Sequence, residues 1–495
     1  MTITPHENIA DLEIRKKDLM NQINNLFGTS IPVNTAADSD SVSGDLAHSN
    51  DSSTTETIAL KLANFEKAIA LLTRELADVM AAIFLQQQIE SEEMKKKEKE
   101  IARSLNRSLK NKGRRLVKIR FLNGTEIYIV MQYYMRNCDE KKQKKRFNCC
   151  YPCLFVLNIY DNCSFELASE ISKLVVCMSS FQEAQEILAS RGCKLNIKTI
   201  RNITKRFAAR ARLSQQSGRY ACDMSLSGEG NRIVLSVDGG RLRERSNKRG
   251  PKTPKKRTRY HTLWREPKLF CIYVVDKNGR VVKDCKPIID GSLDDCEATF
   301  KLMIFYLKQL NISEKDSILF VADGATWIWN RVNDIAKELN LKENQMHQLL
   351  DFYHAVEHLN VFAQAQTGWS NAQKKKWVST QRFNLKNGNT AKVIASIKSA
   401  SVKTQSTIVK TEKEYFLKNE SRMQYAKIAQ MGFPMGSGAM ESTIRRVINL
   451  RLKGPGIFWL KETANEIILL RSYYKAKRWE QLEVMAAHED ILNAA

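Results

Sequence analysis

Two apolar segments that each end in Asp-Gly constrain the fold of this chain most. Residues 231–239 read NRIVLSVDG and residues 317–324 read SILFVADG. Further apolar segments with strand character lie at 268–276, 280–290 and 346–354, and stretches of helical periodicity precede and follow the second Asp-Gly segment. Strands that alternate with helices are typical of layered α/β structures. The sequence therefore predicts an α/β core, whose first part spans residues 231–354.

The acids in these two segments indicate metal binding. Asp238 and Asp323 each follow an apolar strand, and the glycine after each acid leaves space beside the carboxylate. Two carboxylates at neighbouring strand ends repel each other unless a cation lies between them. Their oxygen atoms are ligands that Mg²⁺ or Mn²⁺ prefers, and a pair of such ions can hold a phosphodiester for in-line attack. For either acid alone, the alternative is a plain turn-forming residue.

The charge of the chain indicates a polyanionic partner. The sequence has 79 lysine and arginine residues against 54 aspartate and glutamate residues, a formal net charge of +25. We expect nucleic acid rather than an anionic membrane, because no basic amphipathic helix with a bulky apolar face is evident. A basic protein without such a partner is the alternative. No apolar run reaches the ~18 residues of a membrane span, and the N-terminus lacks the apolar core of a secretory signal, so we expect a cytoplasmic protein.

The most basic stretch of the chain, residues 241–260, follows the first Asp-Gly segment. Its sequence, RLRERSNKRGPKTPKKRTRY, predicts a mobile loop that grips DNA without sequence specificity. The expected phosphate contacts are Arg249, Lys255, Lys256 and Arg257. A solvated loop that binds nothing is the alternative.

The N-terminal region, residues 1–113, is predicted to be helical with one interruption. Residues 11–27 and 57–112 have helical periodicity, and the second stretch becomes highly charged towards its end. Residues 29–56 are rich in Ser, Asp, Asn and Thr, which predicts a flexible linker. Part of 57–112 is expected to form either a coiled coil or a plain exposed helix.

A small module of strands and cysteines is expected over residues 114–180. Two apolar segments flank Asn123-Gly124, which is a strong signal for a β-hairpin. Two cysteines of this module have the CxxC spacing of half a zinc site, and two more are possible partners. Ordinary buried thiols are the alternative to structural Zn²⁺. The candidate ligands are Cys138, Cys150, Cys153 and Cys163.

Residues 181–230 have the layout of a helix-turn-helix. A first helix ends near Ser190, Gly192 lies in a short turn, and a second, basic helix begins near Asn196. In DNA-binding proteins of this layout the second helix enters the major groove. An ordinary helical hairpin is the alternative. The residues expected to contact DNA are Lys198, Arg201, Lys205 and Arg206.

Four separated segments resemble the landmarks of a known enzyme family. They read SVDGGRLRER, FVADGATWIWN, DFYHAVEHL and GSGAMESTIRRVINLRLKGPGIFW. In this order they are similar to motifs of bacterial insertion-sequence DDE transposases of the Kra type and, more distantly, of Mutator-like transposases. The resemblance covers roughly residues 230–475. It implies a ribonuclease-H-like core, interrupted by an all-helical insertion at 355–430 and completed by residues 431–495.

The resemblance also implies a reaction and its residues. The catalytic and metal-binding acids would be Asp238, Asp323 and Glu441, with Asp351 and His354 as the signature that follows the second acid. Two divalent ions, Mg²⁺ or Mn²⁺, would assist cleavage and strand transfer at the ends of a mobile element. The partners would be the terminal repeats, the target DNA and at least one further copy of the chain. Downstream of Glu441, the residues expected along a phosphate backbone are Arg445, Arg446, Arg451 and Lys453.

Two other functions remain open at this point. The first is a domesticated DNA-binding protein that keeps the fold without the reaction; the presence of all three acids weighs against it. The second is a zinc peptidase, because His354-Ala-Val-Glu357-His358 matches the HxxEH signature. A peptidase gives no reason for the two Asp-Gly segments or for the basic charge.

Overall fold

The computed structural model describes residues 5–28, 58–106, 108–136, 149–217, 226, 228–254, 256–402 and 406–487. The chain divides into two compact units. The first extends to Leu174 and also includes Phe181–Arg206, and the second includes Val175–Ser180 and the chain from Phe207 to His488. The predicted helix-turn-helix segment is therefore divided between the units. The predicted linker at 29–56 lies outside the described residues.

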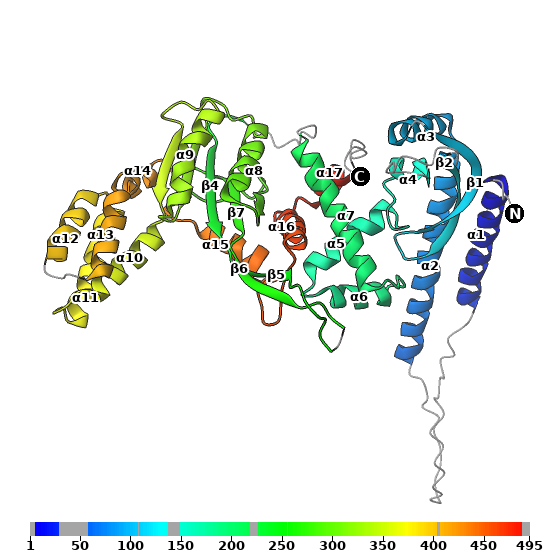
Figure 1. Ribbon diagram of the computed structural model, residues 1–495, viewed down its shortest axis with the longest axis horizontal. Helices are drawn as coiled ribbons and strands as arrows, with labels where there is room; N and C mark the ends of the chain where they lie inside the picture. The colour runs from blue at the N-terminus through cyan, green and yellow to red at the C-terminus, as the bar shows by residue number, and fades with distance from the viewer. Residues whose placement is uncertain are drawn as a thin grey trace, which may run out of the picture. The chain divides into compact units, whose positions relative to one another are not determined.

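The first unit combines helices with a small antiparallel sheet (Figure 1). The strand order is β1-β2-β3; β1 and β2 form an antiparallel hairpin, and the short β3 pairs antiparallel with β2. The helices of this unit are α1 Pro5–Gly28, α2 Ile58–Ile89, α3 Glu92–Leu105, α4 Pro152–Val156, most of α5 Phe165–Cys177, α6 Phe181–Ser190 and the start of α7 Ile197–Gln216, and its strands are β1 Leu109–Arg120, β2 Glu126–Arg136 and β3 Cys149–Cys150.

The predicted hairpin at Asn123-Gly124 is confirmed. Gly124 has φ 96°, and a Cβ at this position would lie 2.7 Å from the Cα of Cys193, so only glycine fits. The buried carboxylate of Asp78 accepts hydrogen bonds from the backbone N–H of Asn123 at 3.2 Å and of Thr125 at 3.1 Å. The turn is therefore fixed to α2 as well as shaped by its own sequence.

The predicted helical pattern over 57–112 is interrupted once, and it is wrong from Leu109 onward. The chain breaks between α2 and α3, where Ser91 caps α3 by accepting a hydrogen bond from Met94 N at 3.2 Å. Residues from Leu109 onward pair with β2 instead of continuing the helix. A serine cap and a cross-strand partner therefore override the helical periodicity of this stretch.

The second unit contains a five-stranded mixed sheet, so the predicted α/β core is confirmed at that level. The strand order is β10-β9-β4-β7-β8, with β4, β9 and β10 parallel and β7 and β8 antiparallel to their neighbours. The central strands are buried almost throughout, which explains their continuous apolar sequences. The elements are β4 Arg232–Gly239, β7 Lys268–Val275, β8 Ile288–Ser292, α8 Cys296–Gln309, β9 Ser317–Ala322, α9 Thr326–Glu338 and β10 Met346–Leu350.

The basic segment 241–260 is not a loop throughout, contrary to the prediction. β5 Leu242–Asn247 pairs antiparallel with β6 Tyr260–Arg265, so only the tip of this hairpin is irregular. β5 also exchanges two backbone hydrogen bonds with Trp459, through Arg245 N at 2.8 Å and Arg243 O at 2.9 Å. This strand is hard to recognise in the sequence because its residues, LRERSN, include only one apolar side chain, Leu242.

The described residues between β10 and the Gly-rich turn at 436–438 are mostly helical, as expected for 355–430. Phe362, Phe416 and Tyr425 form part of their fully buried core. These helices gather in one group in Figure 1. They are α10 Phe352–Gln364, α11 Asn371–Lys386, α12 Thr390–Val402, α13 Thr407–Lys418 and α14 Tyr425–Gln430, and the chain then continues through α15 Gly438–Ile444, a π-helical turn Arg445–Asn449, α16 Lys461–Lys475 and α17 Trp479–Ala487. Among the described residues, no helix has both the length and the apolar character needed to cross a bilayer.

Candidate functional site

The register of the parallel strands brings three aspartates into one row. Ser236 of β4 is opposite Val321 of β9, and two residues further on the same register puts Asp238 beside Asp323. Leu350 of β10 is opposite Ala322 of β9, so Asp351 follows at the same level. The carboxyl ends of β4, β9 and β10 therefore form one acidic edge of the sheet, which we call the acid edge. Two of the three predicted catalytic acids lie there.

Asp238 is half-buried, and its pKa is raised to about 6. Burial is the main cause, and the charges of Asp323 and Glu266 add to it. A hydrogen bond from Gly239 N at 2.6 Å and the nearby His354 act in the opposite direction. Without a compensating cation, Asp238 therefore keeps its proton to a higher pH than an ordinary aspartate does.

Asp323 is held by its own turn. One of its carboxylate oxygens accepts a hydrogen bond from Ala325 N at 3.0 Å, and its carbonyl oxygen accepts one from the indole of Trp329 at 2.7 Å. The next residue, Gly324, is necessary for a different reason: a Cβ there would lie 2.1 Å from the ring of Tyr415. Because Gly324 has no side chain, there is room beside it for the ring of Tyr415, which belongs to α13.

Asp351 is fully buried, and its carboxylate joins two parts of the site. One oxygen accepts hydrogen bonds from Tyr353 N at 2.6 Å and His354 N at 3.1 Å, which caps α10. The other accepts from both the backbone N–H and the hydroxyl of Ser437, just before α15. A backbone hydrogen bond from Phe352 N to Met435 O at 3.1 Å supports the same junction. With its oxygens occupied in this way, Asp351 fits the supporting role expected from the sequence.

Glu441 lies in the first turn of α15, as the sequence predicted. Its side chain is exposed, and α15 packs against β4 and β7 of the sheet. The π-helical turn that follows α15 is a feature frequent near functional sites. Among the described residues, no three His, Cys, Asp or Glu side chains are close enough together to hold a metal ion. The structure thus brings Asp238 and Asp323 together and leaves Glu441 on the adjacent helix.

The HxxEH segment lies in the first half of α10. The Nδ1 atom of His354 is 3.3 Å from Glu357, and the Nδ1 atom of His358 is 2.7 Å from Glu412. The ring of His358 also stacks on that of Tyr415, with centroids 3.7 Å apart. Glu412 and Tyr415 are parts of the site that the sequence did not reveal, because no spacing connects α13 with the Asp-Gly segments.

The described cysteines of the predicted zinc site pack as apolar thiols. Cys150 lies in a small apolar cluster with Leu109 and Tyr134, Cys153 lies in a larger apolar cluster, and Cys163 is fully buried. Burial raises the pKa of Cys150 and of Cys163 to about 11, and that of Cys153 further. Thiols of this kind favour the alternative of ordinary buried cysteines. Cys138 lies outside the described residues, so the four-ligand zinc site stays a prediction.

Most of the basic side chains expected to contact DNA are exposed. On α7, Arg206 is also paired with Asp161 at 3.1 Å. Arg446 is half-buried, and Lys255 lies outside the described residues. Arg451 differs from the expectation: it is only 4 % exposed and lies over the ring of Trp459, so it is not presented to a phosphate. The exposed members are Lys198, Arg201, Lys205, Arg206, Arg249, Lys256, Arg257, Arg445 and Lys453.

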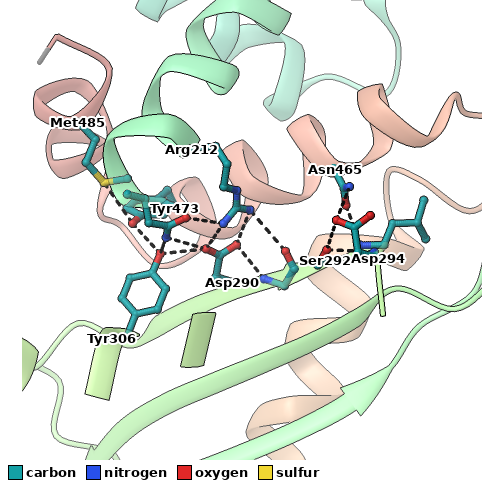
Figure 2. A network of polar contacts seen from close by, with 11 residues as sticks. Arg212, Asp290, Ser292, Asp294, Tyr306, Asn465, Tyr473 and Met485 are labelled. Atoms are coloured by element: carbon teal, nitrogen blue, oxygen red, sulfur yellow. Dashed lines mark hydrogen bonds and ion pairs between the residues drawn. The ribbon is translucent and has the colours of Figure 1, made fainter. Parts of the chain in front are cut away.

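A second set of acids in the core has a structural role (Figure 2). Asp290 of β8 is fully buried and accepts hydrogen bonds from both terminal nitrogens of Arg212, at 2.8 and 3.0 Å. The hydroxyl of Tyr306 also donates to Asp290 at 2.9 Å, and Asp294 is paired with Lys461 at 2.7 Å. A pocket of about 520 Å³ lies beside this network, and none of the three predicted catalytic acids lines it.

Comparison with protein-family models, with curated proteins and with solved structures finds no match to the chain.

Proposed function

We propose that this protein is a DDE transposase that cleaves and joins DNA by phosphoryl transfer at the acid edge. The observation that carries the proposal is the parallel register of β4 and β9, which, extended by two residues beyond Ser236 and Val321, puts Asp238 beside Asp323. The five-stranded mixed sheet with α8 and α9 is compatible with the ribonuclease-H-like core that the sequence resemblance implies.

The chemistry of the edge fits divalent cations. Burial and the charge of Asp323 raise the pKa of the half-buried Asp238, a positive charge between the two acids would relieve this, and carboxylate oxygens suit Mg²⁺ or Mn²⁺. Bound there, a pair of such ions supplies an activated water or 3′-hydroxyl and neutralises the leaving oxygen. Asp238 and Asp323 would hold them together with Glu441, whose helix Asp351 fixes through Ser437. Against this, Glu441 does not join the two aspartates in one cluster, so its approach to the edge is part of the proposal.

The rest of the molecule supplies positive charge for DNA. The exposed arginines and lysines of the β5–β6 hairpin follow Asp238 directly in the chain, and β5 begins three residues after the end of β4. In a chain with a net charge of +25, these side chains would bind phosphates on either side of the bond that is cut. Arg445 and Lys453 beyond Glu441 would extend the same contact.

The test is cleavage of a supercoiled plasmid that carries the element's own ends, with Mg²⁺ or Mn²⁺. We expect nicks or breaks at the ends by the wild type, and none by Asp238→Asn, Asp323→Asn or Glu441→Gln, all of which should still shift the end fragments in a gel. The matched control is Asp334→Asn, an exposed acid on α9 that should cut like the wild type.

Two results would contradict the proposal. Tight binding of the ends without metal-dependent cutting would favour the domesticated DNA-binding protein. One tightly bound zinc ion that is lost in His354→Ala and in His358→Ala would favour the peptidase.

A further inference from the structure

Helix α13 of the insertion contacts the turn after β9 at two points. The ring of Tyr415 lies against Gly324, and the ammonium group of Lys418 donates to Thr326 Oγ1 at 2.9 Å. Gly324 and Thr326 belong to the turn that carries Asp323. The insertion therefore packs directly on the turn of the second acid.

The hydroxyl of Tyr415 is the unusual group in this contact. It is buried, and within the described residues it has no hydrogen-bond partner. A buried donor without an acceptor is costly, so such a group calls for an acceptor in another state of the molecule. The ring carbon that carries this hydroxyl would lie 2.9 Å from a Cβ at Gly324, the residue directly after Asp323. The carboxylate of Asp323 is therefore the acceptor that we consider.

One of the two carboxylate oxygens of Asp323 is available to accept a hydrogen bond. Ala325 N donates to one carboxylate oxygen at 3.0 Å, and in the described part of the chain the other oxygen accepts no hydrogen bond. The Tyr415 ring cannot easily move away, because His358 stacks on one side of it at 3.7 Å and is itself bonded to the buried Glu412. The donor is thus held still beside a carboxylate that has a free oxygen.

We propose that Tyr415 is a positioning residue for the second acid: its hydroxyl donates to the free oxygen of Asp323 when this carboxylate turns to hold a divalent cation. The proposal rests on the proposed metal-binding function of the acid edge. Carboxylates that bind metals are commonly held by hydrogen bonds from neighbouring groups, and loss of one such bond weakens metal binding by about 10- to 100-fold. The insertion would then supply part of the metal site's outer support.

The test measures metal binding directly, with Mn²⁺ titrated into the full-length protein in a calorimeter. Tyr415→Phe removes only the hydroxyl, and we expect it to raise the Mn²⁺ dissociation constant by about tenfold. The concentration of Mn²⁺ for half-maximal plasmid cleavage should rise in parallel, with unchanged affinity for DNA. The matched control is Tyr425→Phe on α14, which removes another buried hydroxyl without a partner in the described residues, and it should bind Mn²⁺ like the wild type.

Each outcome bears on one proposal or the other. If the wild type binds no Mn²⁺, or if Asp238→Asn binds it equally well, the proposed metal site itself is wrong. If binding depends on Asp238 but Tyr415→Phe matches the wild type, only the role of Tyr415 is wrong. Equal weakening by Tyr415→Phe and Tyr425→Phe would indicate a general packing effect and would also overturn that role.

Discussion

At the acid edge, burial and neighbouring negative charges change the pKa of a single residue. Asp238 lies at the end of a buried strand, beside Asp323 and near Glu266, and burial with these like charges raises its pKa to about 6. The folded, metal-free protein therefore retains a proton on Asp238 that the unfolded chain releases near its ordinary pKa of 3.8. Stability from this group is present at low pH and is lost as the pH rises from about 4 to about 6.

This residue-scale effect predicts that Asp238→Asn stabilises the metal-free protein at neutral pH. The gain should be on the order of 2 kcal/mol after allowance for partial exposure, or a few degrees in the unfolding midpoint. It should be small near pH 4 and complete by about pH 7, because only the wild type loses a proton in that window. Thermal unfolding at a series of pH values, with a chelator, measures it. A variant that is no more stable than the wild type at pH 7.5 would contradict the assigned cause.

At the scale of elements, one buried carboxylate couples α10 to α15. Asp351 caps α10 with one oxygen and holds Ser437 with the other, so the orientation of the Glu441 helix depends on a residue 90 positions earlier in the chain. The two segments meet only because β10 and the Gly-rich turn lie at the same end of the sheet. This connection is what would let the third acid approach the first two.

Asp351→Asn should therefore loosen the junction. An amide nitrogen cannot accept a hydrogen bond, so at least one buried donor loses its partner, at a cost of about 1–3 kcal/mol. Urea unfolding measures this loss, and plasmid cleavage should fall with it. Ser437→Ala removes only the hydroxyl bond and should cost less, about 1 kcal/mol. If the two variants are equally stable, the carboxylate is not the group that holds the turn.

At the scale of the whole molecule, the effect of the net charge of +25 depends on where the basic side chains lie. The β5–β6 hairpin carries exposed basic side chains beside the acid edge. Other exposed lysines are paired with glutamates near the amino ends of β9 and β10, such as Lys308 with Glu338 and Lys342 with Glu314. On the proposed function, the first group would meet a DNA backbone that crosses the acids, and the second group would not.

The salt dependence of DNA binding should distinguish these two groups. Replacement of Arg249, Lys256 and Arg257 by alanine should reduce the slope of log affinity against log salt by up to about 0.9 for each phosphate that the variant no longer binds. The control replaces Lys308, Lys315 and Lys342 by alanine, which removes the same charge from ion-paired positions. Fluorescence anisotropy at several salt concentrations gives both slopes. Equal changes in the two variants would mean that total charge, not the hairpin, drives binding.

Local signals in the sequence predicted much of this architecture. The apolar segments before Asp238 and Asp323 were recognisable because strands buried on both faces have unbroken apolar sequences. The hairpin at Gly124 was recognisable because Asn-Gly favours its turn. The partnership of Asp238 with Asp323 was also accessible, since parallel strands end at the same edge.

The remainder depended on contacts that no local pattern records. The β5 strand was concealed because its pairing with β6 and Trp459 does not require apolar residues. Arg451 has the sequence context of a phosphate contact, yet tertiary packing buries it over Trp459. Tyr415 reaches Gly324 across 91 positions of the chain, so only the folded insertion brings its ring to the turn of the second acid.

The junction at Phe352 and Met435 has a consequence for how such a protein can be altered. The chain leaves the sheet and returns to it at points joined by one backbone hydrogen bond of 3.1 Å. A short bridge could therefore replace everything between them without stretching the strands, and a foreign helical cassette could be grafted onto the same two ends. A swap of this kind would spare the strands of the sheet, and any deficit would report what the replaced segment contributes beside Asp323 and Asp351.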